Sequence, residues 1–94
     1  MRLSQEEIDV LKTKLYSLSS EAKLYLFGSR TDDDKRGGDI DLLVVSQKLT
    51  KKDVRLLRID FFKAFGEQKL DIILDKGDFK NPFNKLISQK AILL

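Results

Sequence analysis

Two stretches of the chain carry apolar residues at helical spacing, and each is preceded by a helix-start signal. Ser4 is followed three positions later by Glu7, the pattern of a capping box, and Thr50 with Asp53 repeats that pattern. Gly66 is a stop signal for the second helix. The residues predicted to face the core are Ile8, Leu11, Leu15 and Leu18 in the first helix and Val54, Leu57, Phe61 and Phe65 in the second.

Three short apolar runs, at 24–27, 39–45 and 70–74, are typical of strands. A third helix is predicted where Asn81 can cap a helix that has Pro82 at its first position. The order is helix, strand, loop, strand, helix, strand, helix. It predicts a single α/β (α+β) domain over residues 1–94, with a small mixed β-sheet of about three strands flanked by helices.

The composition narrows the chemistry that the chain can perform. Hydrophobic residues make up 41% and charged residues 35% of 94 residues, as in soluble globular proteins. No apolar run approaches the roughly 20 residues needed to cross a bilayer, and the N-terminus lacks a secretory signal, so we expect a cytoplasmic protein. The absence of cysteine and histidine excludes disulfides, thiolate zinc sites and imidazole catalysis. Carboxylate oxygens remain as metal ligands, and they favour Mg²⁺, Mn²⁺ or Ca²⁺.

Three aspartates fall at the starts of predicted strands. Asp39 and Asp41 are two positions apart, so a strand points both side chains to one face, and Asp71 has the same phase in the next strand. The connection between these strands contains a helix and is long enough for a crossover, which makes the strands parallel. The three carboxylates are then expected to converge and to need divalent cations. Taken alone, Asp39 and Asp41 are better explained as aspartates that cap the exit of the turn at Gly37 and Gly38.

A glycine, a serine and an arginine follow the first predicted strand. If that strand is antiparallel to the second, Gly28, Ser29 and Arg30 lie beside the acidic strand ends. Glycine lets backbone N–H groups approach a phosphate, serine can donate to it, and arginine can bind two of its oxygens. Metal-binding carboxylates that face a phosphate site are the parts of a phosphoryl or nucleotidyl transfer centre.

The motifs LFGSR at 26–30, GDIDLLV at 38–44 and LDIIL at 70–74 resemble those of the minimal nucleotidyltransferases (MNT) in the DNA polymerase beta superfamily. The resemblance covers residues 23–74 and implies a nucleotidyltransferase fold like the polymerase beta palm. It also implies an enzyme that transfers a nucleoside monophosphate, AMP from ATP, to a hydroxyl group. Any one of the motifs alone would be a weak signal, whereas their order and spacing together are fairly specific.

The resemblance also implies a role for each matching residue. Asp39 and Asp41 would bind two Mg²⁺ ions, for which Mn²⁺ could substitute, and Asp71 would help to hold the catalytic metal and activate the acceptor hydroxyl. The triphosphate of ATP would be held by Gly28 and Ser29, with Arg30 neutralising its charge.

Stand-alone chains of this size are similar to the antitoxin of HEPN/MNT toxin–antitoxin pairs, in which the nucleotidyltransferase transfers AMP to a tyrosine of an all-helical HEPN toxin. The family often continues after Gly-Ser-Arg with a second arginine, whereas this chain has three aspartates at 32–34, with Lys35 or Arg36 as possible substitutes. The alternative is therefore a non-catalytic antitoxin that neutralises a HEPN partner by complex formation.

Two further features bear on partners. The four apolar residues at 91–94 predict a contact with a partner or a homo-oligomer interface. A basic stripe formed by Lys51, Arg55 and Arg58 follows one side of the second helix. We interpret the stripe as a solvated face rather than a nucleic-acid site, because no aromatic residues interleave with it to stack on bases.

Overall fold

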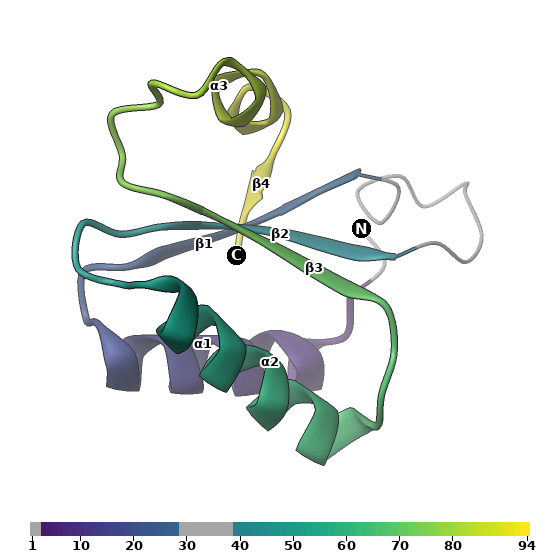
Figure 1. Cartoon of the computed structure of the whole chain (residues 1–94). Helices are drawn as coiled ribbons and strands as arrows, with labels where there is room; N and C mark the ends of the chain where they lie inside the picture. The colour runs from purple at the N-terminus through teal and green to yellow at the C-terminus, as the bar shows by residue number, and fades with distance from the viewer. Residues whose placement is uncertain (1–2, 29–38) are drawn as a thin grey trace.

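Residues 3–28 and 39–94 are described by the computed structural model, and the elements follow the predicted order (Figure 1). Helices α1 and α2 cover one face of a four-stranded sheet with strand order β3-β2-β1-β4, and α3 lies over the other face. No helix in the described part of the chain is both long and apolar enough to cross a membrane. The bounds are α1 Gln5–Leu18, β1 Lys23–Phe27, β2 Ile40–Val45, α2 Lys51–Phe65, β3 Leu70–Asp75, α3 Pro82–Ser88 and β4 Ile92–Leu93.

The predicted helix ends are confirmed by their hydrogen bonds. Glu7 N–H donates to Ser4 Oγ at 3.1 Å while Ser4 N–H donates to Glu7 Oε1 at 2.9 Å, which completes a capping box. The N–H of Gly66 donates to the carbonyl of Phe62 at 2.8 Å and ends α2. Local side-chain chemistry therefore fixes where α1 begins and where α2 ends.

The sheet has the mixed topology that the sequence predicts. Strand β1 pairs antiparallel with β2, and β2 pairs parallel with β3. Alternate residues of each strand turn toward α1 and α2, and this layer is the core. The largest fully buried side chain is Phe61, whose burial contributes about 1.5–3 kcal/mol. Fully buried residues facing it from β1 and β2 include Leu24, Leu26, Ile40, Leu42 and Val44.

The end of the chain forms a fourth strand that the apolar pattern did not predict. Ile92 pairs with Leu26, and Leu93 pairs with Tyr25. Leu94 is partly buried and packs against the core. The free edge of β1 supplies the pairing partner, so this strand depends on tertiary structure rather than on the local sequence. Among the apolar residues at 91–94, the residue most accessible to a partner is therefore Leu93, which is 60% exposed.

A buried carboxylate fastens α3 to the sheet. Asp75 accepts hydrogen bonds from Asn84 Nδ2 at 3.0 Å and from the N–H groups of Gly77 and Phe79 at 2.7 and 3.3 Å. Burial acts to raise the pKa of Asp75, but these three hydrogen bonds together outweigh it and lower the pKa below its usual value. The contact leaves Phe83 and Leu86 exposed on the outer side of α3.

Candidate functional site

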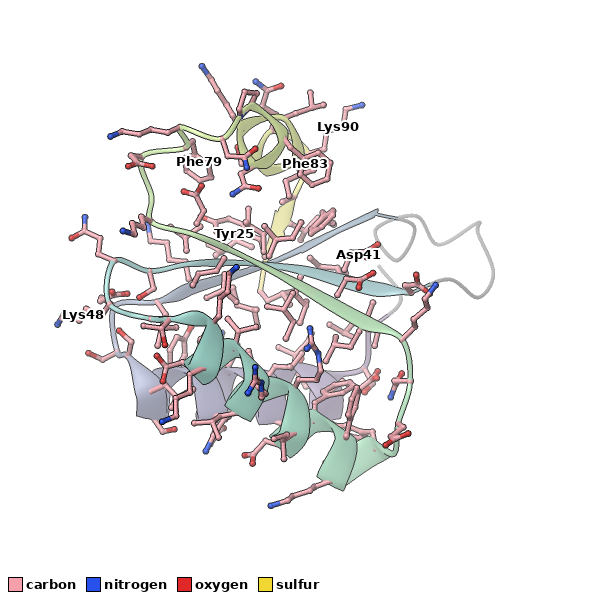
Figure 2. All side chains as sticks on the ribbon, viewed as in Figure 1. Tyr25, Asp41, Lys48, Phe79, Phe83 and Lys90 are labelled. Atoms are coloured by element: carbon pink, nitrogen blue, oxygen red, sulfur yellow. The ribbon has the colours of Figure 1, made fainter. Side chains whose placement is uncertain are left out.

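Two of the predicted site residues meet at one end of the sheet. Asp41 of β2, labelled in Figure 2, is in parallel register with Asp71 of β3. On its other side Asp41 is in register with Phe27, the last residue of β1. Their side chains project from the face opposite α1 and α2, because Ile40 and Leu42 are fully buried on the helix side. The prediction that three carboxylates converge is confirmed for Asp41 and Asp71, whereas the described residues contain no group of three acidic side chains that could hold a metal ion.

The Asp41 carboxyl group is in an unfavourable electrostatic environment. Burial has the largest effect and raises its pKa, the negative charges of Asp71 and Asp39 raise it further, and so does a side-chain hydrogen bond with Asp71. The opposing effect of the Lys69 ammonium group is smaller. Asp41 is half-buried while Asp71 is exposed, so the pair combines an inner carboxylate with one that solvent or a second molecule can reach.

Asp39 lies just before β2 and pairs with a lysine that the sequence analysis missed. Lys69 Nζ is 3.5 Å from Asp39 Oδ2, and the carbonyl of Lys69 accepts from Ile40 N–H at 3.1 Å. The Lys69 side chain is 79% exposed, so this ion pair contributes at most about 1 kcal/mol and can open at little cost. The parallel register could have revealed it, because the residue before β3 lies beside the residue before β2.

Gly28 lies directly against Asp41. Its φ of +79° is a conformation that residues with a side chain rarely adopt. A Cβ atom built on Gly28 would overlap Asp41 Oδ2 and would lie only 3.1 Å from Asp41 Cγ. Glycine is therefore required here for two reasons, the backbone conformation and the close approach of a carboxylate. The other proposed phosphate ligands, Ser29 and Arg30, and the aspartates at 32–34 lie outside the described residues.

The donor set suits a hard divalent cation. Within residues 3–28 and 39–94, no three acidic side chains are arranged as a group that could hold a metal ion. However, Asp41 and Asp71 supply the oxygen ligands that Mg²⁺ prefers, and the mutual repulsion that raises the pKa of Asp41 is the effect that a bound cation would relieve. The carboxylate of Asp39 is instead paired with Lys69. The residues present therefore fit a Mg²⁺ site built on the Asp41–Asp71 pair.

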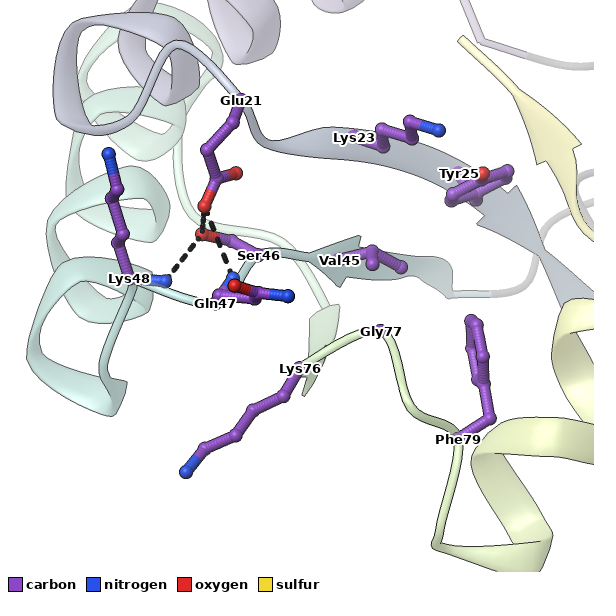
Figure 3. A pocket seen from close by; sticks show the side chains of 10 residues that line it. All are labelled: Glu21, Lys23, Tyr25, Val45, Ser46, Gln47, Lys48, Lys76, Gly77 and Phe79. Atoms are coloured by element: carbon purple, nitrogen blue, oxygen red, sulfur yellow. Dashed lines mark hydrogen bonds between the residues drawn. The ribbon is translucent and has the colours of Figure 1, made fainter.

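A separate hollow of about 500 Å³ lies at the opposite end of the same strands (Figure 3). Its lining includes Lys23 of β1 and Val45 of β2. These two residues face each other in the strand register, four positions along β1 and β2 from the Phe27–Asp41 pair. Three of the residues that line it bond to one another, because Glu21 Oε1 accepts from Ser46 Oγ at 2.7 Å and from Gln47 N–H at 3.1 Å. These bonds stabilise the turn after β2, and the hollow does not contribute to the aspartate site.

Comparison with known proteins agrees with the geometry. Residues 8–93 match the family model for the nucleotidyltransferase domain. No curated protein matches the chain. The matched region contains Gly28, Asp39, Asp41 and Asp71, and the mixed sheet with its helices is consistent with a nucleotidyltransferase fold. The chain belongs to the nucleotidyltransferase domain family.

Proposed function

We propose that the protein is a Mg²⁺-dependent enzyme that transfers AMP from ATP to a hydroxyl group on a partner protein, with a HEPN-type toxin as the acceptor. The observation that carries the proposal is the in-register pair of Asp41 and Asp71, with the Gly28 backbone against Asp41. The arrangement places two carboxylates, whose repulsion a cation would relieve, next to the backbone of a glycine that has no side chain to block the site.

Each residue has a distinct task in this proposal. Asp41, Asp71 and, after release from Lys69, Asp39 would hold the metal ions. Bound Mg²⁺ would neutralise charge on the triphosphate and make the acceptor hydroxyl more acidic. Gly28 keeps the space beside Asp41 clear, and the exposed Asp71 is the carboxylate that an incoming hydroxyl can reach.

The proposed reaction is an in-line displacement at the α-phosphorus. The acceptor oxygen forms a bond to the α-phosphorus, and the bond from that phosphorus to the bridging oxygen of the β-phosphate breaks. Pyrophosphate leaves with the electron pair of the broken bond. The hydroxyl proton passes to the carboxylate of Asp71 and from there to solvent, so a histidine base is not needed.

The second candidate function is an antitoxin that acts by binding alone. It is favoured by the exposed apolar side chains of Phe83, Leu86 and Leu93, which are 55%, 61% and 60% exposed and could contribute to a protein interface. Such an interface would serve either function, or a homo-oligomer, so its presence does not distinguish them.

Transfer to a co-purified HEPN protein distinguishes the two functions. The protein is incubated with ATP, Mg²⁺ and the partner, and the intact mass of each chain is measured. We expect the partner to gain one AMP group with the wild-type protein and with Asp78→Asn, an exposed aspartate remote from Asp41, but not with Asp41→Asn or Asp71→Asn. A stable complex whose partner stays unmodified with either Mg²⁺ or Mn²⁺ would support the binding antitoxin instead.

A further inference from the structure

A basic groove runs between α2 and the outer edge of β3. It has a volume of about 370 Å³ and is lined by Lys51, Val54, Arg55, Arg58, Ile72 and Leu74. The lining contains no acidic residue, and none of the ion pairs among the described residues uses the three basic side chains. The basic stripe predicted from the sequence is therefore one wall of a concave surface, and within residues 3–28 and 39–94 no acidic side chain lines that surface or pairs with the stripe.

The other wall of the groove is an open sheet edge. Strand β3 is the last strand of the sheet on this side, and the carbonyls of Lys69 and Asp75 accept hydrogen bonds from the β2 side. Because the N–H and C=O groups of a strand alternate in direction, the even-numbered residues point theirs away from β2. Outward-pointing backbone groups of this kind belong to Leu70, Ile72 and Leu74. An extended peptide can bond to such an edge as an additional strand.

We propose that this groove binds an acidic, extended segment of the acceptor protein, which pairs with the outer edge of β3. The charge of the groove favours an acidic ligand, and the N–H and C=O groups of Ile72 and Leu74, which point away from β2 at the edge of the sheet, favour a polypeptide. Nucleic acid is a poorer fit, because no aromatic side chain lines the groove to stack on a base.

The geometry of an added strand connects this groove to the aspartate site. Residues opposite Ile72 and Leu74 would turn toward α2 and its arginines, whereas a residue opposite Asp71 would turn toward the carboxylate pair. Neighbouring strands are only about 4.8 Å apart, so that residue would lie beside Asp71. Resting on the proposed function, the inferred acceptor sequence is a hydroxyl residue with acidic residues at the first and third positions on one side, those that lie opposite Ile72 and Leu74.

Binding of a short capped peptide with the core Glu-Tyr-Glu-Val-Glu tests the proposal without ATP or metal. We expect the amide resonances of Ile72 and Leu74 to shift on titration of ¹⁵N-labelled protein. The charge-reversed variant Arg55→Glu/Arg58→Glu should bind the peptide about tenfold or more weakly. The matched control Lys52→Glu/Lys63→Glu places the same charge change on the same helix, outside the groove, and should bind within about twofold of the wild type.

Two N-methylated peptides test strand pairing with the wild-type protein alone. Each carries methyl groups on one alternate set of backbone nitrogens, and in a paired strand only one set faces β3. One peptide should therefore lose at least about tenfold more affinity than the other. The proposal would be overturned if the peptide did not bind, or if both N-methylated peptides lost the same affinity. It would also be overturned if a single-stranded RNA bound the groove and excess Glu-rich peptide did not displace it, or if the protein self-associated through the β3 edge.

These outcomes are separate from the test of the proposed function. Failure of peptide binding while AMP transfer to the partner persists would overturn the groove and leave the enzyme. Peptide binding without any transfer would overturn the enzyme and leave the groove as a docking surface.

Discussion

The close packing of Gly28 against Asp41 gives a prediction whose two components can be measured separately. In Gly28→Ala, the alanine must adopt a φ of +79°, which costs about 1–2 kcal/mol, and its Cβ would overlap the Asp41 carboxylate. The carboxylate must move to relieve the overlap. A displacement of about 1 Å in a catalytic group can lower the rate about 100-fold, and we expect a loss of that order in AMP transfer.

Gly66→Ala is the matched control for backbone strain. Gly66 has nearly the same φ, +83°, but a Cβ atom there would have no heavy atom within 4 Å. Both variants should therefore lose about 1–3 kcal/mol in free energy of unfolding, measured by urea denaturation. Only Gly28→Ala should lose activity. Equal transfer rates for the two variants, with both folded, would refute the conclusion that Gly28 clears space for Asp41.

Three further predictions concern stability and metal binding. Asp75→Ala leaves the buried Asn84 amide and the N–H group of Gly77 without an acceptor and should cost about 2–3 kcal/mol at pH 7 by urea denaturation, against less than about 0.5 kcal/mol for the exposed Asp78→Ala. Because the folded pKa of Asp75 is lowered, the stability that its ionised carboxylate contributes is complete above the unfolded pKa of about 3.9 and is lost as pH falls through the folded pKa. The loss of stability in Asp75→Ala should therefore shrink in acid, and a loss that stays constant with pH would contradict this reasoning. Lys69→Ala removes the cation beside Asp39 and should tighten Mn²⁺ binding two- to fivefold by calorimetry, whereas weaker binding would show that Lys69 helps the site. Ser4→Ala removes the N-cap of α1 and should lower the free energy of unfolding by about 1 kcal/mol, and an unchanged denaturation midpoint would argue against the cap.

The parts of the fold that the sequence predicts are those set by local chemistry or by strand alternation. Ser4 and Glu7 form the predicted cap, and the shared phase of Asp41 and Asp71 gave their common face once the crossover made the strands parallel. Both inferences need only neighbouring residues and the general geometry of helices and strands.

The features that the sequence did not predict depend on contacts between distant segments. Strand β4 has only two residues, and it forms because the edge of β1 is available to Ile92. The bonds from Asn84 to Asp75 and from Lys69 to Asp39 require the relative positions of separate elements. No periodicity in the chain encodes the β4 pairing or the Asn84–Asp75 bond, whereas the Lys69–Asp39 pair follows once the parallel register of β2 and β3 is known.

The position of the transferred label tests the central claim, that the Asp41–Asp71 pair is a nucleotidyl transfer centre, most directly. Parallel reactions with the partner protein and Mg²⁺ would use ATP labelled at the α-phosphate or at the γ-phosphate. We predict that the α-label appears on the partner and the γ-label in released pyrophosphate, and that both signals vanish in Asp41→Asn. Transfer of the γ-label to the partner, or α-label transfer that persists in Asp41→Asn, would contradict the account.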